Sequence, residues 1–236
     1  MCDMHVPDGF LDAPTSIATG AVAVAGIAVA LRGARRELDD RTAPMAGLVA
    51  AFVFAAQMLN FPVGAGTSGH LLGGALAAVL VGPWTAALCL AVVLLVQGLL
   101  FADGGITALG TNISLFSIVA VGVGWLVFAG LRAVLPTRLS IVPAAAGVAA
   151  FVSVPVTAAV FVGLFAIGGQ APVPLDTMLT AMLGWHVLIG VGEALITGLV
   201  VSSVVAARPD LCFGARPALR ARREALVAST GQQAAA

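Results

Sequence analysis

Residues 141–167 read IVPAAAGVAAFVSVPVTAAVFVGLFAI and contain no charged side chain. A helix needs about 20 largely apolar residues to cross the hydrocarbon core of a bilayer, and this stretch is long enough. The rest of the chain has the same character, because 60% of its 236 residues are hydrophobic and 9% are charged. A soluble domain of this length must wet its surface with more charge. The sequence therefore predicts an all-α, polytopic membrane protein.

The apolar segments divide the chain into about seven transmembrane helices. We place them at residues 16–31, 43–60, 70–81, 84–101, 112–131, 141–167 and 177–206. The third is short and ends at Gly82-Pro83, so it is either tilted or partly re-entrant. An arm of residues 1–15 precedes this bundle (16–207), and a tail rich in arginine and alanine (208–236), which we expect to be partly disordered, follows it.

The arginines set the expected orientation of the bundle. The chain has eleven basic residues and no lysine. If the amino terminus lies outside, every arginine falls on the inside, in two loops and the tail, as the positive-inside rule requires. The loops carry Arg32, Arg35, Arg36, Arg41, Arg132 and Arg138, and the tail carries Arg208, Arg216, Arg220, Arg222 and Arg223. We predict an extracytoplasmic arm and a cytoplasmic carboxy terminus.

Composition also excludes several activities. A nucleotide-binding P-loop needs a lysine, so the chain does not hydrolyse ATP by that chemistry. The three cysteines, Cys2, Cys89 and Cys212, are too scattered for a zinc site or a disulfide framework. Basic clusters are confined to short segments beside the membrane, so nucleic acid is not an expected partner.

Two histidines on the expected outer face are candidates for metal binding. Met4-His5 places an imidazole beside a near-terminal amine, and together with the intervening peptide nitrogen these groups form chelate rings suited to Ni(II), Cu(II) or Co(II). His70 follows the glycine-rich loop 60–69 and is expected to open the third helix. Gly64, Gly66 and Gly69 match a dinucleotide-binding pattern, but no soluble strand precedes them and no acid follows at the distance a ribose needs.

Other polar residues are candidates to support this site. His186 and Glu193 lie one heptad apart in the last apolar segment, where ionisable groups are costly and functional by default. His186 is expected to hydrogen-bond across helices or to ligate; Glu193 is expected to support the site, join a packing network or contact a partner subunit. Asp8 either forms a turn or orients a ligating imidazole, and Asp103 is read as a loop residue at a helix end. Asn60, Thr67 and Ser68 complete the supporting set.

Four segments resemble the CbiM/NikM family of substrate-binding membrane subunits of cobalt and nickel energy-coupling-factor (ECF) transporters. They are MHVPDGFL (4–11), NFPVGAGTSGHLLGGALAAVLVGPW (60–84), LLVQGLLFADGGITALGTN (94–112) and AMLGWHVLIGVGEALITG (181–198). The resemblance implies a seven-helix bundle in the cell membrane that binds one metal ion near its outer face. It implies Met4, His5 and His70 as ligands: the methionine amine, the peptide and imidazole nitrogens of the first histidine, and the second histidine.

The resemblance also implies a substrate and partners. Cobalt, for cobalamin synthesis, is the first expectation and nickel the alternative; the ion is bound as substrate and no cofactor is expected. The implied partners are a transmembrane coupling subunit, one or two cytoplasmic ATPase subunits and a small two-span accessory membrane subunit. The chain itself is then a transporter subunit and not an enzyme.

One departure and one alternative bear on this reading. In the family pattern the methionine is the first residue, whereas Met1-Cys2-Asp3 precede Met4 here, so we expect translation to start at Met4. If the longer form exists, an amide that must lose its proton replaces the amine as a ligand, unless Cys2 or Asp3 takes the place of the amine.

The alternative function is a membrane metal-dependent hydrolase with His70, His186 and Glu193 around zinc, but the chain has no H-E-x-x-H pattern.

Overall fold

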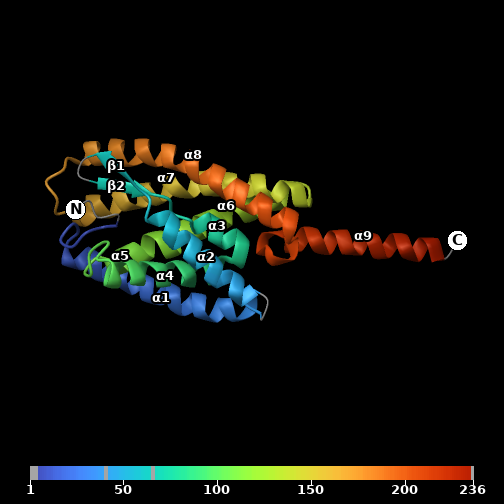
Figure 1. Cartoon of the computed structure of the whole chain (residues 1–236). Coiled ribbons are helices and arrows are strands. Elements are labelled where there is room, and N and C mark those ends of the chain that lie inside the picture. Colours follow the sequence, from blue (N-terminus) through green and yellow to red (C-terminus); the bar gives the residue numbers. More distant parts are fainter. Residues whose placement is uncertain (1–4, 40–41, 65–66, 235–236) are drawn as a thin grey trace.

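The computed structural model describes residues 5–39, 42–64 and 67–234. Long helices run side by side along one axis, and α9 projects beyond one end of the bundle (Figure 1). In chain order the elements are α1 (Ala13–Glu37), α2 (Thr42–Gln57), β1 (Asn60–Gly64), β2 (Thr67–His70), α3 (Gly74–Val81), α4 (Pro83–Leu100), α5 (Leu109–Asn112), a π-helix (Ile113–Ala120), α6 (Val121–Val134), α7 (Val142–Gly168), α8 (Leu175–Ala207) and α9 (Arg216–Ala234), with short 3-10 turns at Leu139–Ile141, Pro209–Leu211 and Phe213–Ala215.

Five of the described helices are long and apolar enough to cross a membrane. They are Ala13–Glu37, Pro83–Leu100, Leu109–Val134, Leu139–Gly168 and Leu175–Ala207. The third of them is continuous through α5, the π-helix and α6, an irregularity that the sequence analysis did not anticipate. The prediction of a helical, multi-pass membrane protein is confirmed, while the direction in which the chain crosses the membrane stays a prediction.

The second and third expected spans are shorter in the structure than in the sequence analysis. Helix α2 has 16 residues, and α3 has 8 and therefore rises only about 12 Å. Every residue of α3 is buried, so this short helix lies in the core of the bundle. The expectation that His70 opens a helix is wrong, because His70 ends strand β2 and α3 begins at Gly74.

The chain between α2 and α3 forms an antiparallel hairpin. Its register pairs Asn60 with His70, Pro62 with Ser68 and Gly64 with Thr67, with an irregularity between Pro62 and Gly64. The strands lie at the same end of the bundle as α5 and the first described residues (Figure 1). The hairpin therefore brings His70 close to the amino-terminal arm.

The tightest helix pairing joins α7 and α8 through small residues. Pro155 has no N–H to donate, so the Phe151 carbonyl loses its helical partner. A Cβ at Gly190 of α8 would lie 3.1 Å from that carbonyl oxygen, and a Cβ at Gly147 of α7 would lie 3.0 Å from the carbonyl oxygen of Ala194. Glycine at these positions lets the two backbones approach closely, which fixes the position of α8 and of the polar residues it carries.

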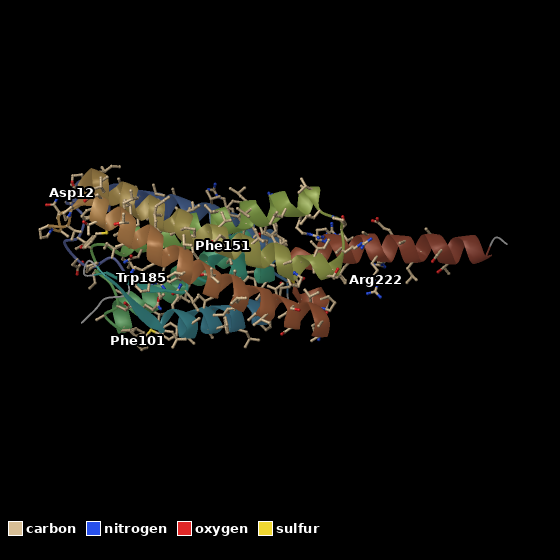
Figure 2. All side chains as sticks on the ribbon, turned by 90° about the horizontal axis from the view of Figure 1, so that it is seen from above. Asp12, Phe101, Phe151, Trp185 and Arg222 are labelled. Carbon is tan, nitrogen blue, oxygen red and sulfur yellow. The ribbon has the colours of Figure 1, made fainter. Side chains whose placement is uncertain are left out.

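The two ends of the bundle carry opposite kinds of residue. Figure 2 shows Asp12 and Arg222 at opposite ends. At the arginine-bearing end, the buried carboxylate of Glu37 accepts hydrogen bonds from the Thr85 amide (2.7 Å), the Thr85 hydroxyl (2.9 Å) and the Trp84 amide (3.3 Å) at the start of α4. The tail differs from the expected partial disorder, since residues 216–234 form α9, in keeping with their many helix-favouring alanines and arginines.

Candidate metal site

The amino-terminal arm is packed onto the bundle from residue 5 onward. The Val6 amide donates to Asn112 Oδ1 (3.0 Å), and the Val6 carbonyl accepts from Asn112 Nδ2 (3.3 Å) and from the Gly105 amide (2.9 Å). Further along, the Asp12 amide donates to the Gly168 carbonyl at 2.7 Å. Hydrogen bonds at Val6 and at Asp12 therefore hold the described part of the arm against the bundle.

The loop after α4 closes over the arm because it contains two consecutive glycines. Gly104 has a φ of +91°, and a Cβ there would lie 2.7 Å from His5 Cβ. A Cβ at Gly105 would lie 2.3 Å from the Asp8 amide nitrogen. Only a residue without a side chain permits this approach.

Asp8 fastens the same loop and does not contact His5. Its Oδ1 accepts hydrogen bonds from the amide of Thr107, at 2.8 Å, and from the Thr107 hydroxyl. These bonds hold the pKa of the Asp8 carboxyl below its ordinary value. Asp8 also lies in the turn in which the Phe10 amide donates to the Pro7 carbonyl at 3.3 Å, which fits the turn-forming interpretation.

His5 and His70 lie beside each other in the interior, with their rings tilted by 56°. Their ring centroids are 4.8 Å apart, and Phe116 lies 5.0 Å from the His5 ring and 5.2 Å from the His70 ring. The exposed fractions are 4% for His5 and 2% for His70. Two imidazoles from segments far apart in the chain therefore share one desolvated pocket with an aromatic wall.

The hydrogen bonds of the pair leave ring nitrogens available to bind an ion. His70 Nδ1 lies 2.9 Å from the Leu71 carbonyl oxygen, which can only accept, so Nδ1 carries the proton and Nε2 carries the lone pair. Burial, with His5 adding to the effect, holds the pKa of His70 far below its usual range, so the ring is neutral at physiological pH. Among the described residues, His5 Nε2 has no hydrogen-bond partner.

Asp103 belongs to this site, although the sequence analysis read it as an ordinary loop residue. Its Oδ2 lies 3.2 Å from His5 Nδ1, and both side chains are almost fully buried. A carboxylate beside an imidazole fixes the ring orientation and raises its basicity. The local sequence, Phe101-Ala102-Asp103-Gly104, carries no signal of this, because the contact depends on where the arm docks.

The two candidates on α8 behave differently from one another. His186 Nδ1 lies 2.7 Å from the Met182 carbonyl oxygen, so this nitrogen bonds within its own helix. The Glu193 carboxylate crosses to the segment after the hairpin and accepts from the Leu72 amide (2.7 Å) and the Gly73 amide (2.9 Å). It therefore has the supporting position that the sequence analysis offered as one of its alternatives.

Some predicted residues cannot be placed. Met4 and Cys2 lie outside the described residues, as do the side chains of Asn60, Thr67 and Ser68. Within the described ranges, no three or more histidine, cysteine, aspartate or glutamate side chains are grouped so as to hold a metal ion. His70, His186 and Glu193 are therefore not gathered into the zinc site that the hydrolase alternative requires.

Comparison with known proteins gives a consistent result along almost the whole chain. Residues 5–211 match the model of the family CbiM, described as the cobalt uptake substrate-specific transmembrane region. A putative fused nickel transport protein NikMN from Archaeoglobus fulgidus is 45% identical over 209 residues, which cover 88% of this chain and 68% of the relative. A putative metal transport protein from Haloquadratum walsbyi is 38% identical, covering 89% and 94%. The crystal structure of a truncated transition metal transporter superposes with a TM-score of 0.80 at 29% identity, covering 86% of this chain and 99% of that one.

Proposed function

The chain belongs to the CbiM family of cobalt uptake transmembrane proteins, and from that premise we propose that His5 and His70 bind the ion that it captures. It is the substrate-binding membrane subunit of a cobalt or nickel ECF transporter. The ion is the substrate, held until the assembled transporter moves it inward.

The single observation that carries the site is the buried pair of imidazoles. Their ring centroids are 4.8 Å apart. Because His70 Nδ1 carries the proton, the lone pair of His70 Nε2 is free to bind a metal ion. A buried ring nitrogen without a hydrogen-bond partner is costly unless something else occupies it, and His5 Nε2 is such an atom within the described part of the chain. A divalent late transition-metal ion meets that need, because imidazole is one of its preferred ligands.

Two histidines alone do not complete a coordination sphere. We assign the remaining donors to the amine of Met4 and the peptide nitrogen of His5, which form fused chelate rings with the His5 imidazole. The packed arm supports this assignment, since Asn112 and Gly105 fix the backbone of Val6, one residue from His5. An all-nitrogen set of this kind suits a planar arrangement around Co(II) or Ni(II).

Cobalt remains the first candidate and nickel the second. The family description names cobalt, whereas the relative from Archaeoglobus fulgidus is named for nickel. In an unselective nitrogen site, intrinsic affinity rises from cobalt to nickel, so affinity alone favours nickel. Competition between the two ions on the purified protein decides this point.

The energy for transport comes from partner subunits. The chain has no lysine and hence no P-loop, so it requires membrane and ATPase partners. We place the contacts of the coupling subunit and the ATPases at the arginine-bearing end of the bundle, opposite the histidine pair. A small two-span accessory subunit is proposed at the outer end, beside the arm.

Replacement of His70 by alanine tests the site. His70→Ala removes one donor from a buried pair, so high-affinity binding of cobalt or nickel is lost while the bundle stays folded. Titration of purified, monodisperse protein with each ion measures this. Glu37→Gln serves as a control because Glu37 bonds to Trp84 and Thr85 at the other end of the bundle. Unchanged metal stoichiometry in His70→Ala would overturn the assignment.

A further inference from the structure

The segment Leu71–Gly73 joins the ligand-bearing hairpin to α3, and side chains from two other helices hold its backbone. We propose that Glu193 is a positioning residue for metal capture, which orients the His70 imidazole through the intervening Leu71–Leu72 peptide group. This inference rests on the proposed function of His70 and names a residue that acts on it without touching the ion.

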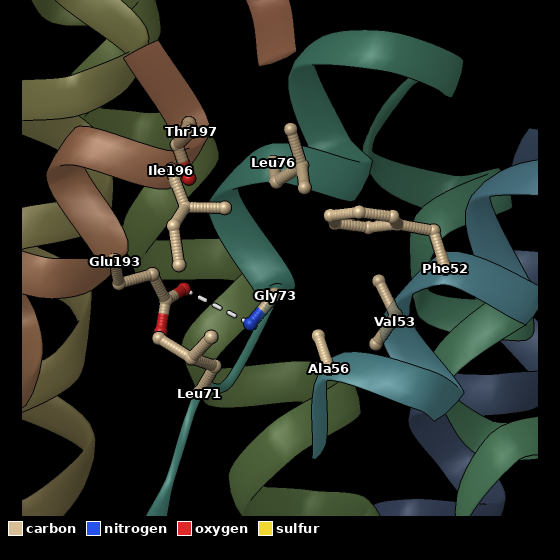
Figure 3. A pocket seen from close by; sticks show the side chains of 9 residues that line it. All are labelled: Phe52, Val53, Ala56, Leu71, Gly73, Leu76, Glu193, Ile196 and Thr197. Atoms are coloured by element: carbon tan, nitrogen blue, oxygen red, sulfur yellow. Dashed lines mark hydrogen bonds between the residues drawn. The ribbon is translucent and has the colours of Figure 1, made fainter. Parts of the chain in front are cut away.

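The carboxylate of Glu193 uses both oxygens on this segment. Oε2 accepts from the Leu72 amide at 2.7 Å, and Oε1 accepts from the Gly73 amide at 2.9 Å. The side chain is 2% exposed, so both bonds lie away from water, where they are stronger. Figure 3 shows Glu193 reaching from α8 to the backbone nitrogen of Gly73, beside Leu71.

The first of these bonds leads directly to His70. A peptide group is planar, so fixing its N–H also fixes the direction of its carbonyl. The Leu72 N–H that Glu193 binds and the Leu71 carbonyl that His70 Nδ1 binds belong to the same peptide group. A continuous chain of hydrogen bonds therefore runs from the carboxylate through one peptide plane to the imidazole.

The second bond fixes the next peptide group in the same way. The Gly73 N–H donates to the Glu193 carboxylate, and the carbonyl of the same peptide group, that of Leu72, accepts from Gln57 Nε2 of α2 at 2.8 Å. Gln57 is fully buried. Gly73 has a φ of +74°, and a Cβ there would lie 2.9 Å from Val53 of α2, so the turn is also confined sterically. Two consecutive peptide planes are thus pinned between α8 and α2.

This arrangement performs the task of the carboxylate that often backs a metal-binding histidine. Such a carboxylate accepts from the distal ring nitrogen, fixes the tautomer and makes the ligating nitrogen more basic. Here one peptide group is interposed, and its carbonyl is polarised by the carboxylate on its N–H. The His70 ring is therefore held with Nε2 unprotonated and ready to bind the ion before the ion arrives.

The other end of the bundle provides a matched control. Glu37 is also a buried carboxylate that binds two consecutive backbone amides at a helix start, Trp84 and Thr85. Its exposed fraction is 6%. Replacing Glu37 or Glu193 with glutamine removes a charged acceptor of two backbone amides in either case. Only Glu193 is linked to His70 by hydrogen bonds through one peptide group.

The decisive experiment compares Glu193→Gln with Glu37→Gln in cobalt and nickel titrations of the full chain. We expect Glu193→Gln to weaken binding about 10- to 100-fold, as is typical when a group behind a ligand is lost. Glu37→Gln should keep wild-type affinity even where its melting temperature falls. Equal loss of affinity in both variants, or in neither, overturns the proposal.

Two further measurements keep the test decisive. Nitrogen NMR of histidine-labelled protein without metal, with His70 assigned from a His70→Gln sample, reports the ring tautomer. Wild type should show the proton on Nδ1, and Glu193→Gln should populate the other tautomer; an unchanged tautomer contradicts the proposal. Should wild type bind no metal while this shift occurs, the proposed function fails and the positioning role stands.

If Glu193→Gln does not yield folded protein, a second variant replaces it. Gln57→Met releases the second peptide plane alone and should weaken metal binding several-fold. Wild-type metal affinity in Gln57→Met would refute the proposal that this peptide plane is held in place.

Discussion

Replacing Gly104 with alanine should misplace His5 without removing any donor. The new Cβ would lie 2.7 Å from His5 Cβ and 3.1 Å from Asn112 Nδ2. Carbon atoms pack at about 3.5–4.0 Å, so His5 or the loop must retreat by about 1 Å. A φ of +91° adds a backbone cost of about 1–2 kcal/mol for a residue with a side chain. A loss of that size corresponds to a roughly 5- to 30-fold fall in the ratio of docked to undocked arm.

The assay for Gly104→Ala is a cobalt or nickel titration of purified protein at fixed pH. The docked arm is the form that binds, so the apparent affinity should fall with the docked fraction, by up to that factor. Gly122→Ala is the matched control, because a Cβ there meets nothing within 4 Å and the residue lies within α6. Gly104→Ala protein that binds metal as tightly as wild type would refute the link between arm docking and capture.

Three other outcomes are expected. A chain beginning at Met4 should bind metal at least about tenfold more tightly than one retaining Met1-Cys2-Asp3, a difference of about 1.4 kcal/mol in matched titrations, because a free amine ligates more readily than an amide. The purified chain should show no ATP hydrolysis, and accumulation of metal in cells should require coexpressed membrane and ATPase subunits. Thr107 lowers the pKa of Asp8 below its ordinary value of 3.8, so the stability that Asp8 adds is fully present above pH about 4 and is lost as the pH falls through the lower folded value. The melting-temperature difference between wild type and Asp8→Ala should therefore be constant near neutral pH and vanish only in strong acid.

The long helices were predictable because their signal is local. Uncharged stretches such as residues 141–167 can only be buried in protein or lipid, and the observed helix Leu139–Gly168 matches that stretch closely. The helix of the tail was also within reach, since Arg216–Ala234 is rich in good helix formers, but its polarity suggested disorder instead.

The hairpin and the environment of the histidines were not predictable, because distant residues determine them. The chain from residue 60 to His70 has no alternation of polar and apolar residues that would indicate strands. The turn after it is held by Glu193, 121 positions away in the sequence. Asp103 likewise meets His5 only after the arm docks on Asn112. The structure brings the two predicted histidines together, whereas their partners could be found only from the fold.

The bond from Glu193 to Leu72 also has a consequence for synthesis. A ribosome makes the chain from the amino terminus, so His5 and His70 enter the membrane long before α8 exists. Until Glu193 is inserted, the Leu72 and Gly73 amides lack their carboxylate acceptor, and Asn112 is still to be made when the arm emerges. The site is therefore complete only after α8, the last long apolar helix, has been made. A nascent chain that ends before α8 contains both histidines but lacks the Glu193 bonds that fix the segment after His70.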